Sequence, residues 1–137
     1  MAQVSKTTNK LYSAVASFLH TASSTCLRPM AMCLDLGDMS AFSEATNAPA
    51  TLSTGAGLTI ASNTLTSTTT AVANDTCRCY HSFVSATSAS VTGFEVMTTT
   101  SGTPWNMLGW CAYASTVNLE NTDTLNNTMD FQMVYTT

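Results

Sequence analysis

The chain carries very little charge. Only 9% of its 137 residues are Asp, Glu, Lys or Arg, whereas an average soluble domain has about 25%. The cations are limited to Lys6, Lys10, Arg28 and Arg78. Because a nucleic-acid footprint needs clustered Lys and Arg to neutralise phosphates, this scarcity predicts that the chain does not bind DNA or RNA.

Long apolar runs are missing as well. A helix that spans a bilayer needs about 20 apolar residues, and no stretch of the chain approaches that length, so we expect no membrane partner. Residues 11–19 follow two lysines and imitate a secretory signal, but Tyr12, Ser13 and Ser17 interrupt the apolar run and His20 follows it directly. We therefore expect this segment to belong to the mature fold.

The cysteines do not form the pattern of a secreted disulfide framework, because their number is odd. They are Cys26, Cys33, Cys77, Cys79 and Cys111. We expect most of them to be reduced core residues. Cys77, Cys79 and His81 alternate on one strand face, and either of the first two cysteines could complete a zinc site. However, structural zinc sites favour Cys pairs two to four residues apart on a knuckle, so we expect neither a metal nor a cofactor.

Polar neutral residues take the place of charge. Threonine is the most frequent residue, Ser and Asn are abundant, and 45% of the residues are hydrophobic. Interspersed aromatic, Met and β-branched residues predict a folded domain rather than a disordered segment. Low charge also means weak mutual repulsion, which favours an oligomer over a free monomer.

The last third of the chain reads as three strands, Val91–Met97, Asn106–Ala114 and Met129–Tyr135. In the last of these, Met and aromatic residues alternate with other residues, which is typical of a half-buried strand. Residues 100–104 make a turn, and residues 118–127 make a long Asn/Thr-rich bend. We expect these strands to form an antiparallel meander that packs on a second layer.

The upstream chain supplies that layer. Residues 1–10 look like a polar arm, and Asn9 could cap a short amphipathic helix over residues 10–20. Strands are predicted at Met30–Leu36, Gly57–Ser62, Thr64–Val72 and Thr76–Ala86. In the first of them, Met30, Met32, Leu34 and Leu36 share one apolar face. Residues 39–56 form an irregular excursion, and long connections of this kind often carry contacts. The fold class is mainly β, an antiparallel, jelly-roll-like β-sandwich with one N-terminal helix, and residues 11–137 form one domain after the arm.

Candidate catalytic residues do not form a pattern. A Cys–His nucleophile pair has no accompanying glycine motif. Asp35 and Asp38 flank Gly37, where capping of a turn is a simpler role than calcium binding. Trp105 and Trp110 could stack on a sugar, but Trp at such positions more often anchors a core or an interface. We expect no enzymatic activity.

The order of elements resembles small virion proteins of tailed bacteriophages that are described as tail-fibre-like or head-decoration proteins. The matching stretches are Met30–Asp35, Ser90–Met97 and Asn106–Tyr113, followed by an Asp-Thr-Leu bend at Asp123–Leu125 before Met129–Val134. The chain departs from the pattern around the bend. It has Thr122 in place of the glycine before it and Asn126-Asn127 in place of the glycine after it.

The resemblance implies a homotrimeric structural protein of the virion, assembled in the host cytoplasm, with the major capsid protein or neighbouring virion proteins as partners. A capsid decoration protein is the first expectation, and a tail-fibre or baseplate component is the second. From another class, a carbohydrate-binding module would use Trp105, Trp110 and Tyr113. The residues that we expect at the assembly interface are Val4, Lys6, Lys10, Phe42, Pro49, Trp105 and Trp110.

Overall fold

The protein is mainly β. The computed structural model describes residues 4–7, 29–68, 76–98 and 107–132. Within these ranges the chain forms strands and no helix. The strands are β1 Val4–Thr7, β2 Ala31–Asp35, β3 Ala61–Ser62, β4 Thr64–Thr68, β5 Thr76–Val84, β6 Ala89–Met97, β7 Met107–Leu119 and β8 Thr124–Gln132. The helix predicted over residues 10–20 lies outside the described residues.

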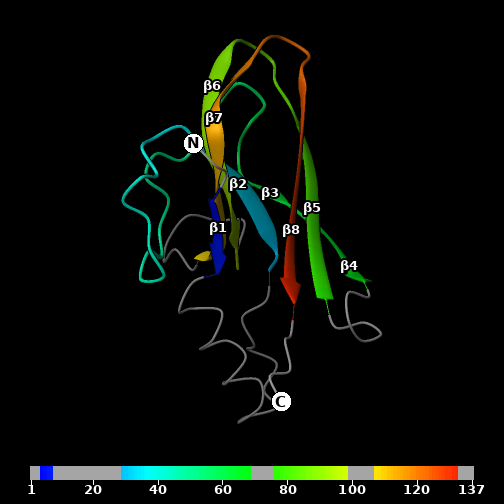
Figure 1. Ribbon diagram of the computed structural model, residues 1–137. Coiled ribbons are helices and arrows are strands. Elements are labelled where there is room, and N and C mark those ends of the chain that lie inside the picture. Colours follow the sequence, from blue (N-terminus) through cyan, green and yellow to red (C-terminus); the bar gives the residue numbers. More distant parts are fainter. Residues whose placement is uncertain (1–3, 8–28, 69–75, 99–106, 133–137) are drawn as a thin grey trace, which may run out of the picture.

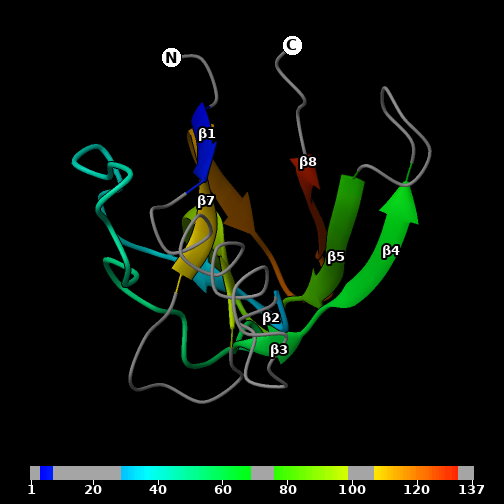
Figure 2. The ribbon, with the colours of Figure 1, turned by 90° about the horizontal axis from the view of Figure 1, so that it is seen from below.

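Two antiparallel sheets pack face to face, so the predicted β-sandwich is confirmed (Figure 1). The larger sheet has the order β1-β7-β6-β2-β3 and the smaller one β4-β5-β8. At one side of the sandwich, Asn63 connects β3, the edge strand of the larger sheet, to β4, the edge strand of the smaller sheet. The other two edge strands, β1 and β8, lie at the opposite side (Figure 2). The strand predicted at Gly57–Ser62 is present as the shorter β3, and the described part of the strand predicted at Thr64–Val72 forms β4. Residues 69–72 lie outside the described residues.

The predicted three-stranded meander is wrong. β6 and β7 do form an antiparallel pair, but β8 pairs with β5 in the opposite sheet. The strand bounds explain the difference: β7 continues to Leu119 and β8 already starts at Thr124. The predicted long bend is therefore a tight turn, residues 120–123, which carries the chain from one sheet to the other.

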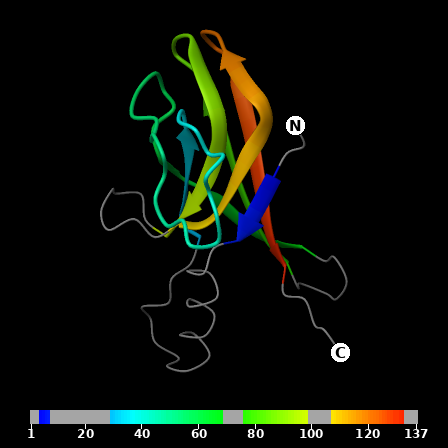
Figure 3. The ribbon, with the colours of Figure 1, turned by 60° about the vertical axis from the view of Figure 1, so that its left-hand side comes forward.

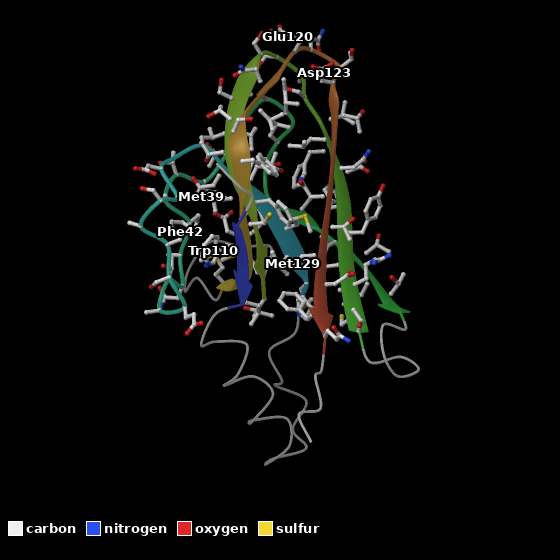
Figure 4. All side chains as sticks on the ribbon, in the orientation of Figure 1. Met39, Phe42, Trp110, Glu120, Asp123 and Met129 are labelled. Carbon is white, nitrogen blue, oxygen red and sulfur yellow. The ribbon has the colours of Figure 1, made fainter. Side chains whose placement is uncertain are left out.

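Hydrogen bonds hold this turn at the tip of the sandwich, where Glu120 and Asp123 lie (Figure 4). The Asp123 amide donates to the Glu120 carbonyl at 3.1 Å, and the Thr122 amide donates to the Ser85 carbonyl at 2.7 Å. The second bond ties the turn to the connection between β5 and β6, which also crosses between the sheets. Thr122 has a φ of 73°. A β-branched residue rarely adopts this left-handed conformation, whereas glycine does so readily.

Thr122→Gly is expected to raise the free energy of unfolding by about 1 kcal/mol, because the left-handed strain at Thr122 exceeds the added entropy of glycine in the unfolded chain. Urea unfolding followed by circular dichroism measures the change. Thr124→Gly is the matched control, since it removes the same side chain from an exposed position of strand β8 and is expected to destabilise the protein. A Thr122→Gly protein that is less stable than the natural one would contradict the strain at this turn.

The main core lies between the sheets. Strand β5 alternates as predicted, with Cys79 and Phe83 buried and Arg78, Tyr80 and Val84 exposed. The alternation predicted for the last strand is confirmed within β8, where Met129 and Phe131 are buried and packed into the main core. An ideal Cβ built on Gly109 of β7 would lie 2.7 Å from the Met129 sulfur, so glycine lets β8 approach β7 closely. Met133 and Tyr135 lie outside the described residues.

Strand β2 differs from the prediction of one apolar face. All five of its residues, Ala31–Asp35, are buried. Met32 and Leu34 face the main core, while Ala31 and Cys33 belong to a second apolar cluster. The flanking Met30 and Leu36, predicted to share a face with Met32 and Leu34, are exposed. Both faces of β2 are buried because another layer covers the outer side of the larger sheet.

Candidate functional site

The additional layer is formed by residues 36–52, which we call the covering segment. It contains most of the excursion predicted at residues 39–56 and lies against the larger sheet on the side away from the smaller sheet (Figure 3). Beyond it the chain returns to the main core, where Leu58 is buried. Its apolar residues Met39, Phe42 and Leu52 pack on the second cluster of the core. The residues of that cluster are Ala31, Cys33, Met39, Met97, Met107 and Trp110. The long connection is therefore a packed structural layer.

Asp35 attaches both ends of this layer to the end of β2. Its carboxylate accepts hydrogen bonds from the amides of Gly37 at 2.7 Å, Ala50 at 2.7 Å and Thr51 at 2.9 Å. The Leu36 amide also donates to the Thr51 carbonyl at 2.8 Å. Asp35 is fully buried. The turn-capping role predicted for Asp35 is confirmed by its bond to Gly37, and the bonds to residues far along the chain were not predictable from spacing.

Asp38 also caps a turn, as predicted. Its carboxylate accepts the Ser40 amide at 2.8 Å, and this bond lowers the pKa of the carboxyl. Unlike Asp35, this side chain is exposed. Both carboxylates therefore accept the backbone amide two residues further on, but of the two only Asp35 also binds amides distant in the sequence.

Glu95 lies next to this attachment and is fully buried on β6. Its Cα pairs with that of Cys33 on one side and that of Trp110 on the other. The Cys33 thiol donates to Glu95 Oε2 at 3.3 Å, and Oε1 has no hydrogen-bond partner. Burial, together with the nearby Asp35 carboxylate, raises the pKa of Glu95 well above its usual value. The environment of Glu95 therefore favours its protonated form.

Sequence reasoning did not single out Glu95. The available signal was a lone carboxylate between apolar residues in the predicted strand Val91–Met97. Alternation places Glu95 on the face opposite Phe94 and Val96, which a strand with one buried face would turn to solvent. The covering segment makes it an interior position instead.

Trp110 lies under the covering segment. Its ring meets Phe42 edge to face with centroids 5.5 Å apart, and Met39 lies beside them (Figure 4). Only 3% of Trp110 is exposed, and its Nε1 has no hydrogen-bond partner. Among the predicted interface residues, Phe42 and Pro49 are half-buried on the covering segment. Val4 and Lys6 belong to β1, while Lys10 and Trp105 lie outside the described residues.

A cavity of about 390 Å³ opens at the margin of the covering segment. It forms where β7 bulges. The pairing of β6 with β7 shifts from Val91–Val117 to Gly93–Ala112, so residues 113–116 have no paired residue on β6 apart from the bulge position at Thr92. The lining residues are Gly37, Asp38, Met39, Ser40, Phe42, Thr92, Trp110, Ala112, Tyr113, Ala114, Ser115 and Thr116. Hydroxyl groups and aromatic rings dominate this lining.

Tyr113 is fixed at the bulge by contacts with both sheets. Its hydroxyl donates to Asn127 Oδ1 of β8 at 2.5 Å, and its ring lies 6.0 Å from that of Phe94. Burial raises the pKa of Tyr113 above its usual value. Its neutral phenol therefore serves as a hydrogen-bond donor between the sheets.

The cysteines of β5 face the interior. Burial raises the pKa of both Cys33 and Cys79, which keeps the two thiols protonated. His81 packs against Phe83 with centroids 4.5 Å apart. Across the described ranges, no three His, Cys, Asp or Glu side chains come together as metal ligands.

Comparison of the chain with protein-family models, with curated proteins and with solved structures finds no match. Among the described residues there is no helix of the length and hydrophobicity needed to cross a membrane.

Proposed function

We propose that this protein is a structural component of a tailed-bacteriophage virion, a capsid decoration protein that stabilises the head through contacts between subunits. In this proposal it is a homotrimer with a jelly-roll-like sandwich and a short helix over residues 10–20. It is assembled in the host cytoplasm and bound to the major capsid protein. Its role is structural, and its surface acts by binding rather than by catalysis.

The observation that carries the proposal is the covering segment. Asp35 and the cluster around Trp110 hold it against the sheet, so its outer residues form a defined surface rather than a free loop. Among residues 36–52 only Asp38 and Glu44 are charged. Protein interfaces are depleted of charge at their centre and gain affinity when the surface is preorganised. A fixed surface with few charges therefore favours contact with another protein.

The test is binding of the purified protein to heads of its parent phage prepared without it. Ala45→Arg places a charge at an exposed position of the covering segment, and Thr128→Arg is the matched control at an exposed position of β8. We expect Ala45→Arg to weaken cosedimentation with heads by at least about tenfold, because a buried unpaired charge is costly at an interface. Thr128→Arg should bind as the natural protein does. Equal binding of all three proteins would contradict a contact through the covering segment, and no binding by the natural protein would contradict decoration.

The cavity beside β7 favours a second candidate, a carbohydrate-binding module. Tyr113 and the hydroxyls of Ser40, Ser115 and Thr116 line it, and aromatic rings with hydroxyl groups suit a sugar. Trp110 is buried beneath Phe42, so the aromatic ring available to a sugar there is that of Phe42. Glycan binding that Phe42→Ala abolishes, without any binding to heads, would favour this function. A tail-fibre or baseplate location is distinguished by binding to tails instead of heads.

A further inference from the structure

The outer edge of β7 requires a hydrogen-bonding partner. Residues 107–111 of this strand are all buried, and β6 pairs with the opposite edge of the strand. Unpaired amide and carbonyl groups at a buried position cost free energy comparable to a lost hydrogen bond. This edge therefore has to be filled by another strand.

Strand β1 fills it. Val4–Thr7 runs antiparallel to β7, with Val4 paired to Ala112, Ser5 to Cys111, Lys6 to Trp110 and Thr7 to Gly109 (Figures 1 and 3). β1 is the last strand on this side of the larger sheet. Its place in the fold depends on backbone pairing with the edge of β7.

The connection between β1 and the next described residues is much longer than this position requires. In the sheet, β1 is separated from β2 by β7 and β6, a distance of about 14 Å at the usual spacing of strands. Residues 8–28 connect the two elements, and even with the proposed helix over residues 10–20 a chain of that length can extend to roughly 50 Å. The same covalent connection can therefore place β1 on the sheet of a neighbouring copy.

We propose that, in the assembled protein, β1 of each copy pairs with β7 of a neighbouring copy. The surface at Gly109–Ala112 is thus the docking site for the Val4–Thr7 strand of a second copy of this chain. The inference rests on the proposed self-association and adds its structural basis. Because the donor and acceptor surfaces differ, the contact is heterologous and closes into a ring when the copies are related by rotation.

Exchange conserves the hydrogen bonds of the monomer. The β1–β7 ladder is the same whether β1 comes from its own chain or from another. The equilibrium between unexchanged and exchanged copies therefore depends on the entropy of association and on contacts between the copies. At the high local concentration of an assembled particle the neighbour's strand is a strong competitor. Exchange then ties neighbouring copies together without any new apolar interface.

Disulfide trapping tests the proposal. Ser5→Cys places a thiol opposite the natural Cys111, since the two positions are paired in the ladder. A double variant that carries both S5C and C111S in the same chain is co-expressed with the natural chain. In this mixture a disulfide between position 5 and Cys111 can form only between two chains. The full-length protein is oxidised, separated on a denaturing gel and mapped by mass spectrometry, while native mass spectrometry reports the oligomer.

Covalent heterodimers linked through position 5 and Cys111 are expected and would support exchange. A second outcome is an oligomer in which the S5C single variant forms the disulfide to Cys111 only within its own chain, while the co-expressed mixture gives no heterodimers. That outcome would overturn strand exchange and leave the proposed assembly intact. A monomer at all concentrations would overturn both. If no bond forms with S5C, the V4C/A112C pair tests the same ladder on its other face. Its failure to link chains would also overturn the proposal.

Discussion

Asp35→Ala is expected to lower the free energy of unfolding by about 3 kcal/mol. The substitution removes a buried acceptor shared by three amides, and hydrogen bonds to a charged group contribute about 1.5–3 kcal/mol each without adding fully. The amides of Ala50 and Thr51 would be left without this partner, so the covering segment should loosen before the sandwich unfolds. Chemical denaturation measures the global effect, and hydrogen exchange at the two amides measures the local one.

Asp38→Ala is the matched control for this prediction. Asp38 also accepts a backbone amide, that of Ser40, but its side chain is exposed and the bond is local. We expect it to cost less than about 1 kcal/mol, because water replaces the lost bond. If both substitutions had the same effect, Asp35 would not be the group that fastens the covering segment to the sheet.

Glu95→Gln is expected to make the protein markedly more stable at neutral and alkaline pH. A glutamate in the unfolded chain titrates near about 4.3, whereas burial and the neighbouring Asp35 carboxylate raise the pKa of Glu95 in the folded protein. Above the unfolded pKa, the unfolded state releases this proton while the folded state keeps it. Stability is therefore lost as pH rises, by about 1.4 kcal/mol per pH unit, until the folded pKa is reached.

The amide of glutamine does not titrate, so the substitution removes this part of the pH dependence. It also keeps the size of the side chain and an oxygen that can accept from the Cys33 thiol. We expect the natural protein and Glu95→Gln to differ little at pH 4 and the advantage of Glu95→Gln to grow as the pH rises from 4 to 8, measured by denaturant unfolding across the range. Glu120→Gln, at the exposed tip turn, is the control for the same chemical change. Parallel stability curves for Glu95→Gln and the natural protein would refute a protonated Glu95.

The sequence was most informative where a strand has one face in the core. The alternation of β5 and β8 correctly assigned Phe83, Met129 and Phe131 to the interior, because a period of two leaves only one face to bury. It failed for strands that lie between layers. In β2 and β6 both faces are buried, and alternation alone does not show that a distant segment covers the outer one.

The candidate site was partly accessible from the sequence. The excursion at residues 39–56 was recognised by its length, and Asp35 by its place before a glycine. Glu95 was missed because its burial depends on contacts that no local pattern records. The partner of β8 was missed for a similar reason: a short connection permits a hairpin, but the chain crossed to the other sheet at residues 120–123.

The sequence by itself determined the elements of this protein: a charge-poor chain whose β-branched, Met and aromatic residues recur at strand periodicity. These are local properties, because propensity and alternation act over a few neighbouring residues. Only the tertiary structure decided that β8 joins β5, that the covering segment encloses Asp35 and Glu95, and that β1 completes the edge of β7. Those outcomes depend on which distant surfaces bury one another, and their energies arise only when the layers are in contact.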